Sequence, residues 1–557
     1  MKSAPTLRRG VEAFAEQLVS IGVRHVFGNP GTTEQAFIDH LQDVDELDLV
    51  LALHEGVAVG AAEGYARASG EPAFVLLHTA AGLGNAMGML ANASLGQTPM
   101  VVYVGDMPRS GLFQEPTLSG PIVAMADSVA RWAHEVRCAD ELPQVLRRAF
   151  KVAAQDPPGP VVLSIPCDVM EELTAAPILG ASYITGDLWP DPQLVAQAAR
   201  ALGGAQRPAI LVGDGIPRAG GQESVARLAD LVGAPVHHGY VTEVCMPPNH
   251  PLDAGPLPLF APGRVSQVLS RYDCVLAVGT EVLKQAFPGA GLPLPEETTI
   301  IHVHTDPHEL SKNQPALNVQ GNPRVVVEQL AAVLSPTIDS DVTSRRREET
   351  VARLAGDREA FLRAVPDEKT ATVLHPAHVA AAVAECLPDH AIIVDESVSA
   401  QPWIAQALSP GPGSWFRSRG GGLGAGMSMA PGVQLAVGDR PVVALVGDGS
   451  AMYTLTSLWT AAHHRLPVTF VILDNAAYAM LKVNVDQYRK AEGQDGGRPY
   501  VAMDLVDPEL DFVSLARGLG VDAVRVCSAA ELRDALTSAI AADVPILIDV
   551  VVGRSLP

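Results

Sequence analysis

Residues 441–450 read Pro-Val-Val-Ala-Leu-Val-Gly-Asp-Gly-Ser. The first six form a continuous apolar run, which is typical of a parallel strand buried on both faces. The next four end that strand in a glycine-rich turn, and we expect a helix to begin just beyond it. A buried strand that passes through such a turn into a helix is the repeating unit of parallel α/β sheets. This stretch therefore predicts an α/β fold.

A second strand of the same kind follows. Residues 468–474 read Val-Thr-Phe-Val-Ile-Leu-Asp, and Asn475 comes next, 27 residues after Asp448. The interval holds one helix and one strand, so both side chains reach the carboxyl edge of one sheet, where such sheets bind ligands. A carboxylate, an amide oxygen and a backbone carbonyl, with a water and phosphate oxygens, complete a Mg²⁺ shell. The free N–H groups at a helix start favour a phosphate. Alone, Gly447-Asp448-Gly449-Ser450 is equally compatible with an ordinary turn; Asn475 favours the metal and diphosphate site.

The alternation of strands and helices recurs along the chain. Val11, Phe14, Leu18 and Ile21 predict a first helix that Gly22 ends. The rhythm breaks at 175–192 and 335–370, where the charge run 345–349 is interpreted as a solvated linker or helix face. We predict three doubly wound parallel-sheet domains, at residues 1–180, 190–336 and 370–557. Strands are expected at 23–27, 73–77, 100–105, 161–165, 209–213, 274–279, 299–304, 391–395, 441–446, 468–474 and 545–551.

Composition excludes several classes of protein. The net charge of −23 argues against a nucleic-acid-binding surface. The sequence lacks an apolar run long enough to span a membrane. Arg8-Arg9 is followed by Val-Glu-Ala-Phe-Ala-Glu at 11–16, with no apolar core and no cleavage site, which favours an ordinary first helix over a twin-arginine signal, and we expect a cytoplasmic protein. The six cysteines are far apart and are interpreted as small buried hydrophobic residues (Cys138, Cys167, Cys245, Cys274, Cys386 and Cys527).

Through Gly447-Asp448-Gly449 and Asn475 the chain resembles the thiamine diphosphate enzymes of the decarboxylase and acetolactate synthase superfamily. Their signature is GDG, a spacer and two asparagines; here Asp474 replaces the first, and Asn475 keeps the second, which is the family's metal ligand. The resemblance implies thiamine diphosphate and Mg²⁺ as cofactors, with Asp448, Asn475 and the carbonyl of Ala477 as metal ligands. It also implies cofactor contacts from Ser397, Val398, Gly447, Gly449, Ser450, Tyr478, Ala479 and Met480.

The amino-terminal third carries a second set of residues. Glu55 lies in the apolar stretch 51–60, which predicts a buried carboxyl group whose neutral form is favoured. By resemblance Glu55 contacts the aminopyrimidine of the cofactor and promotes loss of the C2 proton, and Asn85 is a further cofactor-binding residue. A salt-bridged core glutamate is the alternative. Residues 420–424, Gly-Gly-Gly-Leu-Gly, resemble the loop in which a bulky residue, here Leu423, bends the cofactor, while Gly421 faces the pyrimidine.

The chain resembles benzoylformate decarboxylases most closely. Residues 28–34, Gly-Asn-Pro-Gly-Thr-Thr-Glu, and 77–88, Leu-His-Thr-Ala-Ala-Gly-Leu-Gly-Asn-Ala-Met-Gly, match two of their loops. The resemblance implies that Thr32 hydrogen-bonds the substrate carboxylate and that His78 transfers protons, a role that suits imidazole. A purely structural histidine is the alternative. Asn29, Met480 and Leu481 would complete the substrate pocket.

The pattern departs from that relative in the middle domain. Its second catalytic histidine aligns with Ala286, and no histidine lies nearby. Val398 and Met480 replace smaller or polar pocket residues, and Met480 would crowd an aryl ring. Residues 113–115, Phe-Gln-Glu, resemble an acetolactate synthase element but are also compatible with a plain loop. FAD is conceivable in the middle domain, yet residues 213–215, Gly-Asp-Gly, are weak support for it, and His302-Val303-His304 is common to the superfamily.

These features together predict decarboxylation of a small 2-oxo acid through a C2 carbanion and an enamine. A carboligase or C–C lyase that uses the same enamine is one alternative, and a non-catalytic module that keeps the fold is another. The resemblance implies a homodimer or homotetramer whose active sites lie between the first domain of one subunit and the third domain of another.

Overall fold

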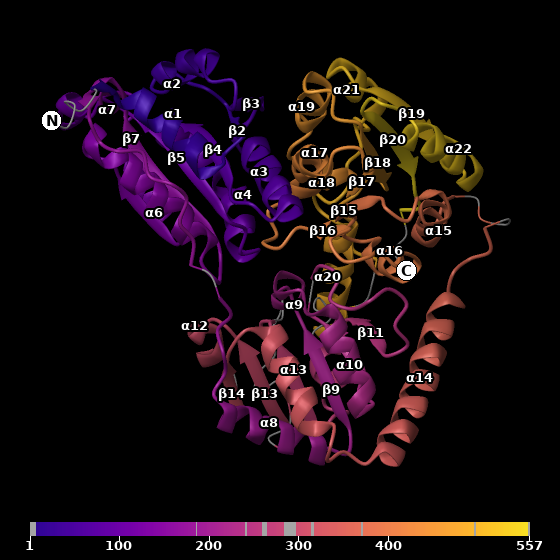
Figure 1. Cartoon of the computed structure of the whole chain (residues 1–557). Helices are drawn as coiled ribbons and strands as arrows, with labels where there is room; N and C mark the ends of the chain where they lie inside the picture. The colour runs from indigo at the N-terminus through magenta and orange to yellow at the C-terminus, as the bar shows by residue number, and fades with distance from the viewer. Residues whose placement is uncertain are drawn as a thin grey trace. The chain divides into compact units, whose positions relative to one another are not determined.

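The computed structural model describes residues 7–184, 186–239, 242–258, 264–282, 294, 297–312, 317–368, 371, 373–494 and 497–554. The chain divides into two compact units. One comprises residues 1–184, 372–404 and 418–557, and the other comprises 185–371 and 405–417. Three six-stranded parallel sheets form the framework (Figure 1). The predicted fold class of three parallel-sheet α/β domains is thereby confirmed.

The first sheet has the order β3-β2-β4-β5-β7-β6. Helices α1 (Gly10–Ile21) and α6 (Leu142–Ala154) cover one face, and α3 (Glu55–Ser69) and α4 (Thr79–Leu95) lie on the other (Figure 1). Phe14 of α1 packs edge-on against Phe37 and Tyr103, with ring centroids 5.0 and 5.3 Å apart. The strands are β2 (His25–Gly28), β3 (Asp48–Leu51), β4 (Ala73–His78), β5 (Met100–Asp106), β6 (Trp132–Glu135) and β7 (Pro160–Pro166). The remaining elements are α2 (Gln35–His40), η1 (Leu41–Asp43), η2 (Arg109–Gln114), α5 (Ile122–Ala126), η3 (Ala139–Glu141), α7 (Cys167–Glu171), and the antiparallel pair β1 (Arg8–Arg9) and β8 (Leu173–Thr174).

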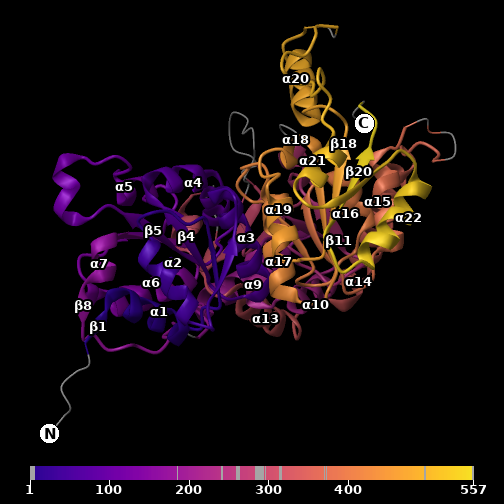
Figure 2. The ribbon, with the colours of Figure 1, turned by 90° about the horizontal axis from the view of Figure 1, so that it is seen from above.

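The sheet that contains the apolar run 441–446 has the order β16-β15-β17-β18-β20-β19. Its strands are β15 (Ile392–Glu396), β16 (Trp415–Arg417), β17 (Val442–Gly447), β18 (Val468–Asp474), β19 (Asp522–Val526) and β20 (Ile546–Val551). Its helices are α15 (Pro376–Cys386), α16 (Gln401–Ala407), α17 (Ala425–Val437), α18 (Asp448–Ala451), α19 (Ser457–His463), α20 (Ala479–Ala491), α21 (Phe512–Gly518) and α22 (Ala529–Ile540). Of these, α20 stands away from its sheet (Figure 2), and Ala479 is its one buried residue.

Close packing of α3 against α17 joins the first and third sheets within one unit. Glycines make this approach possible. A Cβ atom on Gly64 would lie 2.2 Å from the carbonyl oxygen of Met429, and one on Gly432 would lie 1.8 Å from that of Ala61. Gly60 likewise leaves room for the side chain of Ser428. Because any side chain at these points would overlap backbone, the glycines set how closely the two helices pack.

The other unit contains a sheet of order β11-β10-β9-β12-β13-β14. Its strands are β9 (Pro208–Val212), β10 (Val236–His238), β11 (Asp253–Pro256), β12 (Cys274–Val278), β13 (Thr299–His304) and β14 (Leu317–Gln320). Its helices are α8 (Pro192–Gly204), α9 (Gly215–Ala219), α10 (Gln222–Val232), α11 (Arg264–Leu269), α12 (Pro307–Ser311), α13 (Pro323–Leu334) and α14 (Ser340–Leu362).

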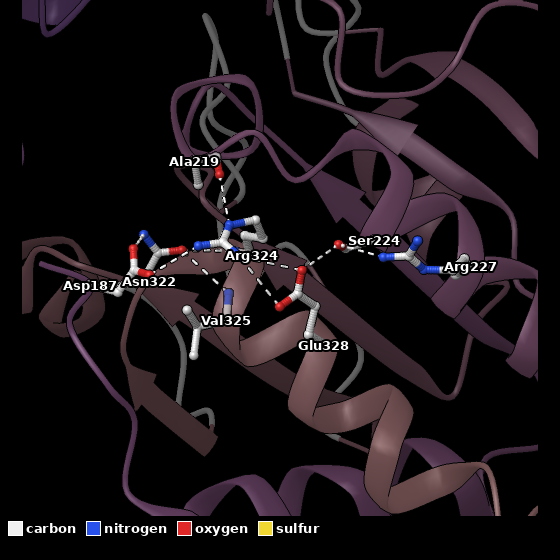
Figure 3. A network of polar contacts seen from close by, with 8 residues as sticks. All are labelled: Asp187, Ala219, Ser224, Arg227, Asn322, Arg324, Val325 and Glu328. Carbon is white, nitrogen blue, oxygen red and sulfur yellow. Dashed lines mark hydrogen bonds and ion pairs between the residues drawn. The ribbon is translucent and has the colours of Figure 1, made fainter.

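A polar network fixes the start of this unit against α13 (Figure 3). The Arg324 guanidinium lies 2.9 Å from the Asp187 carboxylate and donates to the carbonyl of Ala219 at 3.1 Å. Asn322 caps α13 through Oδ1 and donates through Nδ2 to Asp187 at 2.9 Å. These contacts tie Asp187, near the start of this unit, to the first turn of α13. Asp187 lies within the break in the alternation of strands and helices that the sequence predicts at 175–192.

The predicted strands coincide with observed strands to within a residue or two, and the first helix ends at Gly22, whose φ is +101°. In the three six-stranded sheets, every strand that the sequence did not predict lies at a sheet edge or next to one. These strands are β3, β6, β10, β11, β14, β16 and β19. The charge run 345–349 lies on helix α14, which agrees with its interpretation as a helix face. Arg346 is not fully solvated, because it donates to the carbonyls of Val232 and Ala205 at 2.9 Å each.

The expectation that all cysteines are buried is wrong. Cys245 and Cys274 are buried, Cys527 is exposed, and the other three are half-buried; all six are free thiols. Within the described ranges no helix is long and apolar enough to cross a membrane.

Candidate active site

The end of β17 forms a tight, buried turn. Gly447 ends the strand and precedes the short helix α18, whose first residue is Asp448. The Asp448 side chain is only 3% exposed. It accepts hydrogen bonds from the backbone N–H of Gly449 at 2.8 Å and from that of Ala477 at 3.2 Å. Burial raises the pKa of Asp448 to about 7, although these N–H donors favour its charged form.

The neighbouring strand brings Asn475 to the same edge. β17 and β18 pair in parallel, with Gly447 opposite Leu473. Asn475 is nearly buried, and its Oδ1 accepts from the backbone N–H of Ala477 at 3.0 Å. Ala477 thus donates to both predicted metal ligands, and its own carbonyl accepts from Ala479 at 2.9 Å. The structure therefore brings Asp448, Asn475 and Ala477 together as the sequence predicts.

Tyr478 covers the glycine of this turn. A Cβ atom on Gly449 would lie 2.6 Å from the Tyr478 ring, so the ring packs directly on the glycine. The backbone N–H of Tyr478 donates to Met503, and that of Leu505 donates to Ala476, which has a φ of +51°. Residues 503–505 therefore support the loop 475–478, which carries two of the predicted metal ligands. The sequence does not predict this contact, because helix α20 separates the two segments along the chain.

The substitution of aspartate at position 474 is balanced by a cation. Asp474 forms an ion pair with Arg525 of β19 at 3.2 Å and accepts from the N–H of Ala476 at 3.0 Å. Arg525 also lies 3.4 Å from the fully buried Asp549. Burial and the charge of Asp474 raise the pKa of Asp549 to about 7. Arg525 thus supplies positive charge beside two carboxylates at this sheet edge.

A cation suits this donor set. Within the described residues there is no group of three or more His, Cys, Asp or Glu side chains that could hold a metal ion. The predicted site uses instead one carboxylate, one amide oxygen and one backbone carbonyl, which are the hard oxygen donors that Mg²⁺ prefers. Burial and the nearby charge of Asp474 raise the pKa of Asp448, and a divalent cation at this position would favour its charged form.

The glycine-rich loop 420–424 is anchored by a buried carboxylate. Glu396, at the end of β15, accepts from the backbone N–H groups of Gly424 at 3.0 Å and Gly426 at 2.7 Å. Burial raises the pKa of Glu396 to about 7. Gly421 and Gly424 have φ values of +81° and +92°, which only glycine adopts without strain. Leu423 is half-buried, and Gly421 is exposed.

The residues just after β15 are strained. Ser397 is buried and donates to Asp395 at 2.6 Å. Val398 follows with a φ of +44°, a region that β-branched residues avoid. Such strain is concentrated at ligand sites, because the surrounding structure must hold it in place. The position of Val398 at the carboxyl edge of the sheet agrees with its predicted role beside the cofactor.

The amino-terminal group is built around Glu55, the first residue of α3. His54 caps this helix by accepting from the N–H of Gly56 at 3.0 Å. The carboxylate of Glu55 accepts from the Asn85 amide of α4 at 3.0 Å, so two of the residues expected at the cofactor are in contact. Glu55 is half-buried in the single chain, in contrast to the buried position that its apolar surroundings predict. The helix start places its side chain at the sheet edge and not in the core.

His78 ends β4 and contacts two buried residues that sequence reasoning overlooked. Its Nδ1 lies 3.0 Å from Oε2 of Glu34 and 3.0 Å from Oγ1 of Thr33. Thr33 and Glu34 are buried, whereas Thr32, the predicted substrate ligand, is exposed. The matching loop 28–34 contains both residues, but nothing in its sequence distinguishes the two buried positions from Thr32.

The other predicted pocket residues lie on the surface of the same unit. Asn29 and Met480 are half-buried, and Asn85 and Leu481 are exposed. Phe113 of the Phe-Gln-Glu element is 80% exposed and lies on η2. The exposed apolar side chains at 113 and 481 are available for contact with substrate or with another chain.

The glycines at 213–215 have a packing role. A Cβ atom on Gly215 would lie 2.6 Å from Cα of Gly279, and one on Gly213 would lie 2.6 Å from Cβ of Thr280. These glycines therefore let two strand-end loops meet. His302 is buried and lies 3.1 Å from the carbonyl of Thr280. The position of the missing histidine, Ala286, lies outside the described residues.

Comparisons with known proteins agree with this arrangement. Three domain families of thiamine pyrophosphate enzymes match the chain. They are the N-terminal TPP binding domain at residues 8–118, the central domain at 195–330 and the C-terminal TPP binding domain at 397–550. The benzoylformate decarboxylase of Pseudomonas aeruginosa is 34% identical over 538 residues, covering 95% of this chain and 96% of that protein. An acetolactate synthase large subunit of Parasynechococcus marenigrum is 29% identical, covering 99% and 89%.

A solved structure shows the same fold. The thiamine diphosphate-dependent 4-hydroxybenzoylformate decarboxylase of Rhodococcus jostii RHA1 superimposes with a TM-score of 0.86 at 30% identity, covering 99% of this chain and 100% of that chain. Full-length similarity, three matching domain models and the paired sheet-edge groups lead to one conclusion: the chain belongs to the thiamine pyrophosphate enzymes, in the branch that includes benzoylformate decarboxylases and acetolactate synthases.

Proposed function

We propose that this protein is a Mg²⁺- and thiamine diphosphate-dependent decarboxylase of a 2-oxo acid. The observation that carries the proposal is the link between His78 and Glu55 through α4. His78 immediately precedes this helix, and Asn85 on the same helix donates to Glu55. Helix α4 therefore connects the imidazole at its start to the carboxylate at the start of α3, through the hydrogen bond from Asn85. The 34% sequence identity with a benzoylformate decarboxylase, over 95% of this chain, supports this reaction.

The carboxyl-terminal group holds the cofactor. Asp448, Asn475 and the carbonyl of Ala477 would bind Mg²⁺, and the N–H groups at the start of α18 would face the diphosphate. Asn85, Ser397, Val398, Tyr478, Ala479 and Met480 would line the rest, with Gly421 at the pyrimidine and Leu423 below the bend. When bound, thiamine diphosphate supplies a nucleophilic carbon for the 2-oxo group and an electron sink for the loss of carbon dioxide.

The amino-terminal group acts on the substrate. Glu55 would exchange a proton with the pyrimidine ring nitrogen of the bound cofactor. Thr32, exposed in the loop between β2 and α2, donates its hydroxyl proton to the substrate carboxylate in a hydrogen bond, and His78 transfers protons at the reacting carbon. Asn29, Met480 and Leu481 shape the pocket, where Met480 limits the size of the side chain but can adapt to it.

The two groups are proposed to meet between subunits. The first domain (1–180) would bind the pyrimidine, the third (370–557) the diphosphate, and the middle domain (190–336) would be structural, without need of FAD. The smallest active form is then a homodimer, and a homotetramer of two such dimers fits the family. A partner subunit would also cover Glu55, which is half-buried in the single chain.

A second candidate is a carboligase that joins the decarboxylated fragment to another carbonyl compound. The absence of a histidine around position 286 of the sequence favours it, because the relative's second histidine supplies a proton that ends the reaction. Likeness to acetolactate synthases over almost the whole chain also favours it. A non-catalytic module is disfavoured, because Glu55, Asp448 and Asn475 are all present and placed.

A substrate screen tests these alternatives. The protein with thiamine diphosphate and Mg²⁺ is offered benzoylformate, 4-hydroxybenzoylformate, pyruvate and branched 2-oxo acids, and carbon dioxide, aldehyde and ligated products are quantified. Release of aldehyde equal to carbon dioxide supports the decarboxylase. Ligated product in place of aldehyde overturns it in favour of the carboligase, and no turnover of any acid favours the module. Glu55→Gln serves as the control that should bind cofactor without activity.

A further inference from the structure

Glu34 is a buried carboxylate that faces the imidazole of His78. Its side chain is 1% exposed, and it comes from the loop after β2, whereas His78 ends the adjacent strand β4. Oε2 of Glu34 lies 3.0 Å from Nδ1 of His78 and accepts from the backbone N–H of Gly31 at 2.9 Å. Thr33 donates its hydroxyl proton to Oε1 of Glu34 and lies 3.0 Å from the same ring nitrogen.

Two glycines make room for this pair. A Cβ atom on Gly105 of β5 would lie 1.6 Å from Oε1 of Glu34, and one on Gly31 would lie 2.1 Å from Cγ of His78. The carboxylate therefore occupies the space that any side chain at 105 would fill, and the ring lies against the backbone of Gly31. Backbone from two strands and one loop holds both groups in one orientation.

The surroundings make Glu34 a strong partner. Burial raises the pKa of Glu34, while the Thr33 hydroxyl, the His78 ring and the Gly31 N–H lower it. The other titratable groups that face it are Tyr103 of β5 and Cys167 of α7, and burial raises the pKa of both. Neither carries positive charge, and the His78 ring is the imidazole that contacts Glu34 in this cluster. A charged partner in a dry site makes a hydrogen bond stronger than in water.

We propose that Glu34 is a positioning residue for His78. It accepts a hydrogen bond from Nδ1–H, which fixes the tautomer, and leaves Nε2 to take up or release the transferred proton. Nδ1 keeps its own proton throughout, so one proton enters or leaves at Nε2 in each transfer. Thr33 holds the carboxylate in line. The same arrangement of base and buried carboxylate orients imidazoles in other acid–base enzymes. The inference rests on the proposed decarboxylase function.

Glu34→Gln tests the inference, with Glu46→Gln, an exposed glutamate of the same domain, as the matched control. The glutamine fills the same space but carries no charge. We expect kcat to fall about 10- to 100-fold with KM changed less than threefold, by analogy with the loss of groups that orient a functional histidine. The acidic limb of the pH profile of kcat should move to lower pH, because removal of the carboxylate disfavours the protonated ring. Equal kcat and an unmoved profile would overturn the proposal.

A double-mutant cycle separates positioning from folding. Adding Glu34→Gln to His78→Ala should lower kcat no further, because Glu34 acts through His78. Additive losses would instead show a structural effect of Glu34 and would overturn the proposal. If Glu34→Gln folds poorly, Thr33→Val reports on the same pair, and it should lower kcat in the same direction by a smaller factor.

A measurement without substrate keeps this inference distinct from the proposed function. Diethyl pyrocarbonate reacts with the unprotonated ring, and peptide mass spectrometry gives the rate at His78 alone. At pH 6 we expect faster modification of His78 in Glu34→Gln than in wild type, because the carboxylate stabilises the unreactive protonated ring. Equal rates would overturn the role of Glu34. Faster modification in a protein that turns over no 2-oxo acid would keep the Glu34–His78 pair and remove the decarboxylase assignment.

Discussion

Oε2 of Glu396 lies 2.7 Å from the backbone nitrogen of Gly426 and accepts its hydrogen bond. The other carboxylate oxygen accepts from Gly424 at 3.0 Å, so one buried side chain at the end of β15 holds both sides of the turn into α17. This turn follows Leu423 directly. The conformation of the loop expected to bend the cofactor is therefore set by a residue 27 positions earlier in the chain.

Glu396→Gln should loosen this loop. A glutamine has one acceptor oxygen in place of two, so one backbone N–H loses its partner and faces an amide N–H₂ group. The cost is about 1–2 kcal/mol, and we expect the dissociation constant for thiamine diphosphate to rise about 10-fold. Fluorescence titration with cofactor at saturating Mg²⁺ measures it. Glu385→Gln, which changes an exposed ion pair with Arg533, is the control; equal affinities for both variants would refute the role of Glu396.

Asp448→Asn tests the metal site. The amide keeps the shape and can accept one of the two backbone hydrogen bonds, but it lacks the negative charge that a divalent cation needs. We expect the Mg²⁺ concentration for half-maximal cofactor binding to rise at least about 100-fold, equivalent to about 2.7 kcal/mol. Circular dichroism of the bound cofactor during Mg²⁺ titration reports it. The exposed Asp439→Asn in the same domain should titrate like wild type, and a normal titration of Asp448→Asn would rule out this ligand.

Gly64→Ala should destabilise the contact between α3 and α17. The added methyl group would lie 2.2 Å from a backbone oxygen, so the helices must separate. Overpacking of this kind costs about 1–3 kcal/mol. Urea denaturation gives the change in unfolding free energy. Gly518→Ala, at the end of α21 where a Cβ atom meets nothing within 4 Å, is the control and should be neutral or slightly stabilising. Similar stability of the two variants would show that the helices are not held by this contact.

Asp549→Asn should change how stability depends on pH. The folded pKa of Asp549 is raised from 3.8 to about 7. Between these values the folded state binds more protons than the unfolded state, so unfolding free energy falls as pH rises from about 4 to 7. Removing the charge should relieve on the order of 2 kcal/mol of this loss at pH 8 relative to pH 4. Denaturation at a series of pH values measures it.

The control for this series is Asp543→Asn, an exposed residue just before β20. It should leave the slope of stability against pH as in wild type. Arg525→Gln should act in the opposite direction to Asp549→Asn, because it removes the positive charge beside Asp474 and Asp549. A slope that is the same in wild type and Asp549→Asn would contradict the buried, ionising carboxylate.

Residues that follow buried strands were predictable. The apolar runs at 441–446 and 468–474 identify central parallel strands, because only strands covered on both faces are apolar throughout. Parallel pairing then brings their carboxyl ends to one edge, so Asp448 and Asn475 had to approach each other. Edge strands such as β11 and β19 carry mixed polar and apolar residues, and their pattern does not distinguish them from loops.

Contacts between segments far apart in the chain were not predictable. The partner of His78 depends on which residue of the loop 28–34 turns inward, and the structure selects Thr33 and Glu34 over Thr32. Arg525 reaches Asp474 from β19, and residues 503–505 support the loop 475–478. No periodicity in the sequence encodes these pairings, since they follow from how the helices and loops pack.

By itself the sequence determined the fold class and the family and indicated the residues that we propose for metal and diphosphate, because short motifs after buried strands impose local backbone geometry. Only the tertiary structure decided which groups surround the site residues. Glu396 accepts hydrogen bonds from the glycine loop, Arg525 forms an ion pair with Asp474, and Glu34 faces His78. The reason is that burial and charge act through space. The energy of a carboxylate depends on every group within a few ångströms, whatever their separation along the chain.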